Sequence, residues 1–196
     1  MLPPDCLPKS PASDYFAQGC EDGTWARFVH ALCERNRVEA GREPTPSAAC
    51  IASQAVKTTE VGGPARGDDG RKKINGRKRH LLVETRGWLI AVLITRAGRD
   101  DGVAAPRRRA HVTPAALPRL GVILADQKYH NYVFAAWLAA PRAGWRLDIT
   151  MRPEGTKGCT PLAKRWVVER THAWHGRDRR HSKDDERTVE SSTAMI

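Results

Sequence analysis

The spacing of apolar residues divides the chain into a helical segment and a longer region of mixed strands and helices. Apolar residues recur at roughly helical intervals from Trp25 to about Ala40, which predicts a helix that ends at Gly41. Residues 1–11 are rich in proline and show no periodicity. Residues 43–46 read Glu-Pro-Thr-Pro and predict a stiff linker to the rest of the chain.

The region after the linker has the pattern of a mixed α/β sheet. A short apolar run at residues 48–53 predicts a buried strand, and residues 57–75, rich in glycine, threonine and charge, predict an exposed loop. Two further strands are predicted at 77–84 and 88–95, joined in a hairpin at Arg86-Gly87. After them the pattern predicts a helix at 100–116, interrupted by two prolines, and a strand at 122–125. The last predicted elements are a helix at 132–140, a strand at 145–151 and a helix at 162–180. Antiparallel pairing followed by crossover helices is typical of a sheet with helices on both faces. The polar tail from Ser182 is expected to fray.

The composition of the chain favours a polyanionic binding partner. The net charge is +11, and cations that meet phosphates release condensed counterions, so the excess favours a nucleic acid. The alternative is a charged surface that only keeps the protein in solution. The five cysteines show no C-x-x-C or zinc-finger spacing, and neither a signal peptide nor an apolar run of about 20 residues is present. We therefore expect a protein of the reducing cytoplasm without a membrane span.

The basic residues are clustered rather than spread along the chain. The predicted DNA contacts form two groups, Arg71, Lys72, Lys73, Arg77, Lys78 and Arg79 in the first, and Arg177, Arg179, Arg180 and Lys183 in the second. Residues 107–109 form a third basic run, for which DNA contact and a solvated surface are equally good interpretations. Contacts of this kind position DNA without reading its sequence, and they predict weak binding that salt disrupts.

Two acidic residues stand where a sheet and a helix can bring carboxylates together. Asp126 follows the predicted strand at 122–125, and Glu169 lies within the predicted C-terminal helix. Cleavage of phosphodiesters with two divalent metals needs carboxylates that converge from different elements. An aspartate after a strand is also often a helix cap, and a glutamate in a basic helix often pairs with an arginine four residues away. The pattern alone leaves both interpretations open, and the first predicted strand contains no acid.

Three long strings of sequence resemble one family of enzymes. They are IASQAVKTTEVGGP at residues 51–64, DGRKKINGRKRHLLV at 69–83 and RWVVERT at 165–171. These strings resemble the insertion sequence five family of bacterial DDE transposases, and the likeness runs from about Tyr15 to the last residue. Because long and unusual strings agree rather than one short pattern, the resemblance is specific.

The resemblance implies an RNase H-like catalytic domain that cuts and transfers DNA strands with Mg²⁺ or Mn²⁺. It places the second and third metal-binding and catalytic acids at Asp126 and Glu169. Arg165 stands four residues before Glu169, as in the Arg-x-x-x-Glu arrangement of the superfamily, and with Arg170 it is added to the predicted DNA contacts. The implied partners are double-stranded DNA at the ends of the insertion sequence and a homo-oligomer on that DNA, and the implied location is the bacterial cytoplasm at the nucleoid. Residues 1–46 are expected to be a remnant of an N-terminal DNA-binding segment, and residues 47–196 the catalytic domain.

The chain departs from the family at several positions of this site. The family's first tripeptide is Asp-Ser-Gln, whereas here Ala52 precedes Ser53 and Gln54, and alanine supplies no oxygen ligand. The family's Gly-Gly-Tyr after the second acid is replaced by Gln-Lys-Tyr at residues 127–129. We therefore expect metal binding to be weakened and strand transfer to be negligible.

Polar residues also replace large apolar residues of the family in the C-terminal helix and after it. They are His172, His175, Asp178, His181 and Asp185. Glu169 and His172 lie three residues apart on one helical face, so a metal site is one interpretation. We prefer the other, in which these are core positions that have become polar at a cost in stability.

Three functions follow from these observations. The chain is a transposase by descent that is catalytically defective, or a non-enzymatic DNA-binding remnant that regulates an intact transposase, or a relic that folds poorly. Restoring an aspartate at position 52 distinguishes the first from the third, and inhibition of an intact relative distinguishes the second.

Overall fold

The computed structural model describes residues 9–60, 63, 65–104, 112–139, 144–151, 155 and 164–196 of the chain. Its elements are, in chain order, α1 (Lys9–Glu21), α2 (Thr24–Glu39), β1 (Ala48–Lys57), β2 (Gly67–Asp69), β3 (Ile74–Glu84), β4 (Leu89–Arg96), α3 (Asp101–Ala104), β5 (Val122–Ala125), the 3-10 helix η1 (Gln127–Tyr129), α4 (Tyr132–Ala139), β6 (Arg146–Ile149), α5 (Trp166–Arg177), the 3-10 helix η2 (Arg179–His181) and α6 (Val189–Ala194).

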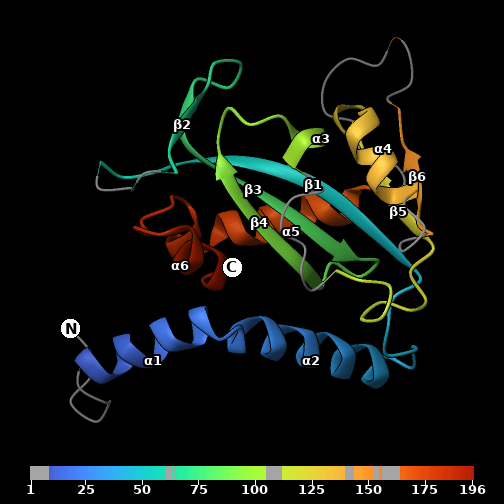
Figure 1. Ribbon diagram of the computed structural model, residues 1–196, viewed down its shortest axis with the longest axis horizontal. Helices are drawn as coiled ribbons and strands as arrows, with labels where there is room; N and C mark the ends of the chain where they lie inside the picture. Colours follow the sequence, from blue (N-terminus) through green and yellow to red (C-terminus); the bar gives the residue numbers. More distant parts are fainter. Residues whose placement is uncertain are drawn as a thin grey trace.

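The strands form one mixed sheet in which β4, β3, β1, β5 and β6 follow one another in space. The β1–β3 and β3–β4 pairs are antiparallel, whereas β5 pairs in parallel with both β1 and β6. The short strand β2 pairs with the first residues of β3 and forms an arm that projects from the body (Figure 1). Three antiparallel strands followed by two parallel ones, with flanking helices, form an RNase H-like core, which confirms the predicted fold class.

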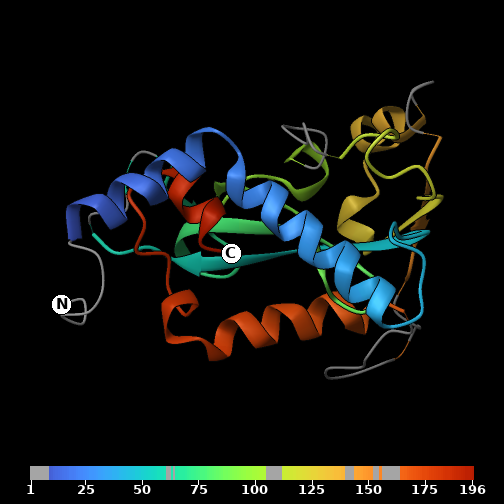
Figure 2. The same ribbon diagram turned by 90° about the horizontal axis from the view of Figure 1, so that it is seen from below.

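Alternate residues of the central strands face two separate cores. Ala49 and Ile51 of β1 join the core that contains residues of α4, while Cys50 and Ala52 join the core that contains residues of α5. Figure 2 accordingly shows α5 on one face of the sheet and α4 on the opposite face. The α4 core also contains a series of aromatic contacts among Tyr129, Phe134, Trp137 and Trp145. Burial on both faces explains why the predicted strands read as apolar runs rather than alternating patterns.

The turn of the β3–β4 hairpin packs directly on α5. Gly87 has a φ of +92°, a conformation that glycine adopts without strain, so the hairpin predicted at Arg86-Gly87 is confirmed. The carbonyl of Gly87 accepts a hydrogen bond from the Thr171 hydroxyl at 3.1 Å, and the Arg86 carbonyl accepts one from Arg170 at 2.7 Å. A Cβ atom at Gly87 would lie 2.8 Å from the Thr171 Oγ1 atom, so the close approach itself requires glycine.

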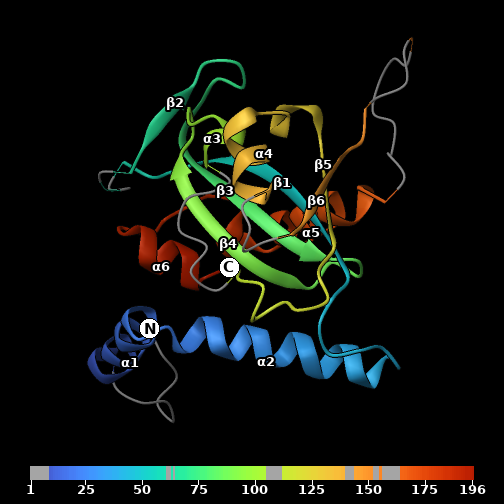
Figure 3. The same ribbon diagram turned by 45° about the vertical axis from the view of Figure 1, so that its right-hand side comes forward.

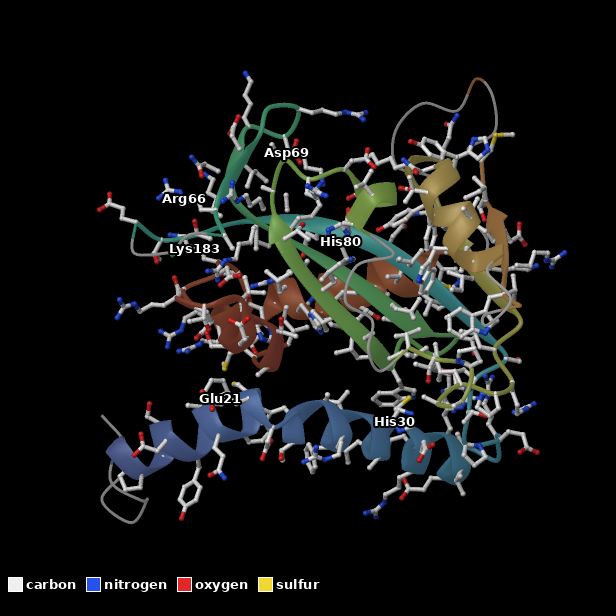
Figure 4. All side chains as sticks on the ribbon, viewed as in Figure 1. Glu21, His30, Arg66, Asp69, His80 and Lys183 are labelled. Atoms are coloured by element: carbon white, nitrogen blue, oxygen red, sulfur yellow. The ribbon has the colours of Figure 1, made fainter. Side chains whose placement is uncertain are left out.

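Helix α2 lies beside the β4 edge of the sheet, and α1 continues past it beside α6 (Figures 1 and 3). Arg37 of α2 is buried, and its guanidinium pairs with the buried carboxylate of Glu84 at the end of β3. The same guanidinium donates to the Glu43 carbonyl at 2.8 Å and thereby holds the predicted linker. His30 lies on the side of α2 that faces β4, where it lines a small hollow with Leu89 and Ile90 (Figure 4). The predicted domain boundary at residue 46 is therefore crossed by a buried ion pair.

The C-terminal segment is ordered and partly buried, so the expectation that it frays from Ser182 was wrong. The backbone of Asp184 bridges to β1 through its N–H, which donates to the Lys57 carbonyl at 2.9 Å. Its buried carboxylate lies 3.0 Å from the Arg77 guanidinium of β3 and accepts a hydrogen bond from the Ser192 hydroxyl of α6. Two charged side chains thus fix a tail whose composition predicted disorder.

Three further elements differ from the pattern-based expectation. The predicted loop at residues 57–75 contains β2, because pairing with β3 satisfies its backbone groups. The helix predicted at 100–116 is limited to the single turn α3 before residues 105–111, which lie outside the described residues. Helix α1 was not predicted, because Pro11 suggested irregular structure, yet proline is tolerated in the first turn of a helix.

We expect the buried Arg77–Asp184 pair to contribute strongly to stability. An Asp184→Asn variant removes the negative charge of this buried pair, and removal of one partner of such a pair lowers the free energy of unfolding by about 3–5 kcal/mol. The matched control is Asp185→Asn, since Asp185 is exposed and a surface change has an effect within about 0.5 kcal/mol. Urea denaturation measures both. Equal stability of the two variants would contradict the role given to this pair.

Candidate active site

Ala52 and Asp126 occupy the same level of two adjacent strands. Cys50 of β1 pairs in parallel with Leu124 of β5, and two residues further along each strand are Ala52 and Asp126. Ala52 and Leu124 belong to the core on the α5 side, and the extended backbone of Asp126 continues the alternation of β5. A carboxylate at position 52 would therefore stand beside Asp126 and on the same face of the sheet.

The Asp126 side chain has two separate partners. Its Oδ1 atom accepts a hydrogen bond from the backbone N–H of Lys128 at 3.1 Å and caps the 3-10 helix η1. Its Oδ2 atom lies 3.8 Å from the Nη2 atom of Arg165. The cap interpretation of Asp126 thus describes one oxygen, while the other oxygen faces the N-terminal end of α5.

Glu169 reaches the same arginine from α5. Its Oε1 atom lies 3.5 Å from Arg165 Nη2, which is the i, i+4 pairing that the sequence left open. The side chain of Arg165 is 7% exposed, whereas those of Asp126 and Glu169 are 30% and 47% exposed. The structure therefore brings the two predicted acids together around one buried guanidinium.

The comparison with known proteins agrees with this geometry. A family model described as the transposase DDE domain matches residues 43–196. The chain belongs to the DDE transposase family. A search among curated proteins finds no match. Membership implies action on DNA and the general use of divalent metal ions, and it gives a functional context to the two acids on the α5 face of the sheet.

The donor set of this transposase does not fit a two-metal centre. Such a centre needs carboxylates that neutralise and position two hard cations, and here Ala52 contributes neither charge nor an oxygen side-chain ligand. Within the described parts of the chain, no group of three or more histidine, cysteine, aspartate or glutamate side chains is arranged to hold a metal. The Arg165 guanidinium lies 3.8 Å from Asp126 and 3.5 Å from Glu169.

Of the two histidines of α5, His172 is buried and His175 is half-buried. His172 is buried, and its pKa is lowered to about 4 by burial first and by neighbouring His175 second. The pKa of His175 is also lowered to about 4, by burial and then by His181, whose ring centroid lies 5.2 Å away. Both imidazoles are therefore neutral near pH 7. Burial favours the interpretation as core positions that carry polar residues over the metal interpretation of Glu169 and His172.

Three of the predicted DNA contacts are used inside the protein. Arg77, Lys78 and Arg79 are all buried in β3, although their sequence resembles a surface basic patch. The Lys78 ammonium lies 3.2 Å from an Asp101 carboxylate oxygen. The Arg79 guanidinium donates to the His181 carbonyl at 2.6 Å. These cations hold α3 and the C-terminal segment, and as the chain is folded they do not face a DNA backbone.

The other predicted contacts lie nearer the surface, apart from the buried Arg165. Arg71, Lys72 and Lys73 form the turn between β2 and β3, on the arm that also carries Arg66 and Asp69 (Figure 4). The pKa of Lys72 is lowered by partial burial and by the nearby charge of Lys128. Exposed cations also stand at the C-terminal end of α5 and in η2, namely Arg177, Arg179 and Arg180, the last paired with Glu186 at 2.7 Å. Arg170 lies between the rings of Trp166 and Trp174, 4.5 Å from each centroid. The third predicted basic run, residues 107–109, lies outside the described residues.

Arg165 is the part of the site whose role the sequence did not indicate. The Arg-x-x-x-Glu spacing predicted its proximity to Glu169, but it was interpreted as a DNA contact. Only the fold shows that the same guanidinium also faces Asp126, on a different element.

Within the described residues, no helix is both long and apolar enough to cross a membrane.

The buried imidazole of His172 predicts a loss of stability in acid. Its pKa is lower in the folded chain than the usual 6.5, so its contribution is complete above that value and is lost as the pH falls toward 4. We expect unfolding to become easier by about 2 kcal/mol between about pH 7 and pH 5 from this group. In a His172→Leu variant this part of the pH dependence disappears, whereas in the exposed control His130→Leu it persists. Urea titrations at both pH values measure the difference, and an unchanged pH dependence in His172→Leu contradicts the prediction.

Proposed function

We propose that the chain is an insertion sequence five transposase that has lost DNA strand cleavage and transfer because Ala52 replaces the first acid. The observation that carries the proposal is the parallel register of β1 and β5. It sets position 52 beside Asp126 on the side of the sheet that α5 covers. A carboxylate at position 52 would have stood next to Asp126, so its absence removes a ligand from the immediate neighbourhood of that acid.

The neighbouring serine does not replace the lost acid. Ser53 follows Ala52 in an extended strand, so its side chain points to the opposite face of the sheet. A hydroxyl is in addition a poor substitute for a carboxylate toward Mg²⁺, which prefers charged oxygen ligands. Asp126 and Glu169 remain placed to bind a cation, but neither the charge nor the geometry of a three-carboxylate centre is present.

Exposed cations support retained binding to double-stranded DNA, in which the protein acts as a homo-oligomer at the ends of the element. Arg71 and Lys73 extend from the β2 arm, while Arg177 ends the helix that carries Glu169 and Arg179 follows it. These groups touch phosphates rather than bases, so the binding depends on salt more than on sequence.

A second function follows from the same observation. A chain that keeps its DNA-binding surface but lacks an acid occupies DNA ends without cutting them, and it regulates an intact transposase.

Cleavage of terminal-repeat DNA with Mg²⁺ or Mn²⁺ tests the enzymatic part of this proposal. We expect background cleavage by the unmodified chain, and at least about tenfold more nicking by Ala52→Asp, because a ligand of the metal is restored. The matched control is Ser53→Asp, which adds the same charge one residue further along on the opposite face. Robust cleavage by the unmodified chain would show that Ala52 is no defect. A folded Ala52→Asp variant that remains inactive would favour the non-enzymatic function.

The DNA-binding part predicts a strong dependence of affinity on salt. Replacement of Arg71 and Lys73 by glutamine removes up to two phosphate contacts, so the slope of log affinity against log salt falls by about 1 for each contact. The control Arg35→Gln changes an exposed side chain of α2 that is paired with Glu39, and we expect no change in slope. Fluorescence anisotropy with a labelled duplex measures both. An affinity of the unmodified chain that does not respond to salt would rule out phosphate contacts as its basis.

A further inference from the structure

We propose that the outer side of α5 binds unpaired bases of a DNA strand, which stack on Trp166 and Trp174 next to Glu169. The two indoles, together with Arg170 between them, form a surface that we call the aromatic stripe. The inference rests on the proposed function in that DNA is the ligand, but it does not depend on whether the chain cleaves DNA. It adds contacts to bases to the phosphate contacts proposed for the β2 arm.

The aromatic stripe runs along the side of α5 that faces away from the sheet. Trp166, Arg170 and Trp174 are spaced four residues apart, so they follow one another along one face of the helix. Val167 and Val168 are buried on the side that packs against the sheet. Figure 2 shows α5 as the outermost element on its face of the sheet. The stripe is therefore presented to solvent rather than to the core.

The packing within the stripe leaves part of each indole available to a ligand. The guanidinium carbon of Arg170 lies over both rings, 4.5 Å from each centroid. Trp166 is nevertheless 45% exposed and Trp174 is 48% exposed, although tryptophan is on average a highly buried residue. Because the arginine stands between the two rings, it covers one face of each. The exposed remainder of each indole offers a flat apolar surface to a planar group.

The turn of the β3–β4 hairpin holds the stripe in place. The Nη2 atom of Arg170 donates a hydrogen bond to the Arg86 carbonyl at 2.7 Å. A Cβ atom at Gly87 would lie 3.6 Å from the Cζ3 atom of Trp174, so that ring packs on the same turn. The neighbouring Thr171 hydroxyl donates to the Gly87 carbonyl. Side chains that are already fixed lose little conformational freedom when a ligand binds, which favours a binding role for the stripe.

Charge and position favour a DNA strand as the ligand. Arg86 and Arg177 are exposed at the edge and at the end of the stripe, so the surroundings of the indoles attract a polyanion. Cations that follow a phosphate backbone, combined with aromatic rings that stack on bases, are the features by which proteins bind single strands. Glu169 is three residues from Trp166 on the helix, so the stripe borders the candidate active site.

The same geometry selects unpaired bases over an intact duplex. In a duplex the faces of the bases are covered by their neighbours in the stack, and a side chain outside the helix reaches only their edges. A base must leave the stack before its face can meet an indole. Stacking is also tolerant of sequence, because every base has an aromatic face. The stripe therefore fits a strand that is opened next to Glu169, whatever its sequence.

Binding of two labelled single strands tests this inference without any cleavage assay. The probes are a strand of about twelve thymidines and an abasic strand of the same length, which keeps the phosphates and lacks the bases. We expect the unmodified chain to bind the thymidine strand at least about tenfold more tightly. In Trp166→Leu and in Trp174→Leu this affinity should fall at least about fivefold, while the affinity for the abasic strand stays unchanged. Fluorescence anisotropy at one salt concentration measures all of these affinities.

Equal affinities of the unmodified chain for the two strands would overturn the inference, and so would an equal loss on both probes in the leucine variants. The matched control is Tyr132→Leu, which removes an exposed aromatic ring from α4 on the opposite face of the sheet. We expect no change with either probe there, and a loss as large as that of the tryptophan variants would also overturn the inference.

Intrinsic tryptophan fluorescence gives a second measurement that needs no variant, in case a leucine variant does not fold. Stacked bases quench indole emission, so the thymidine strand should quench the fluorescence of the unmodified chain at saturation and the abasic strand should not. Equal quenching by the two strands would contradict stacking on the indoles.

This inference and the proposed function fail independently. If base-dependent binding is lost in the tryptophan variants, but Ala52→Asp does not nick DNA and duplex binding does not respond to salt, the aromatic stripe binds bases and the proposed function is wrong. If Ala52→Asp nicks DNA and duplex binding depends on salt, while the thymidine and abasic strands bind equally, the proposed function holds and this inference is wrong.

Discussion

The burial of charged residues in β3 is the constraint on which the rest of the structure depends. This strand lies between β1 and β4 and is buried from Arg77 to Glu84, yet it carries three consecutive cations and a carboxylate. A buried charge without a partner is strongly destabilising, so each of these groups requires a counter-charge or carbonyl oxygens from elsewhere. Glu84 binds Arg37 of α2, Lys78 binds Asp101 of α3, and Arg77 binds Asp184 of the C-terminal segment. One strand thereby attaches both ends of the chain to the sheet.

This constraint also marks the limit of what the sequence could predict. The hairpin, the strands and the position of Asp126 at the end of a strand could be predicted from local sequence, because turn residues and apolar runs determine structure over only a few neighbouring residues. The basic run in β3 resembles a surface patch for the same reason, since its partner Asp184 stands more than one hundred residues away. The C-terminal tail was predicted to fray because its polarity is visible locally and its buried contacts are not. Long-range pairing decided both cases.

The candidate site shows the same division between local and long-range information. The family resemblance predicted Asp126 and Glu169 as acids, and the absence of an acid at position 52, from short stretches of sequence. Their relation in space comes from the β1–β5 register and from Arg165, neither of which a local pattern reveals. The arginine places one positive charge within 4 Å of a carboxylate oxygen of each acid, a relation to Asp126 that the sequence pattern did not indicate.

Stability and chemistry are therefore carried by different parts of this chain. The β3 network that fixes the helices and the C-terminal segment does not include position 52, Asp126 or Glu169. Three carboxylates held close together repel one another unless cations bind them, so replacement of one by alanine relieves repulsion in the metal-free protein. An apolar alanine in the core with Leu124 and Val168 is also compatible with packing against α5. An alanine at position 52 is therefore compatible with the fold, and an RNase H-like core is by itself no measure of catalytic activity.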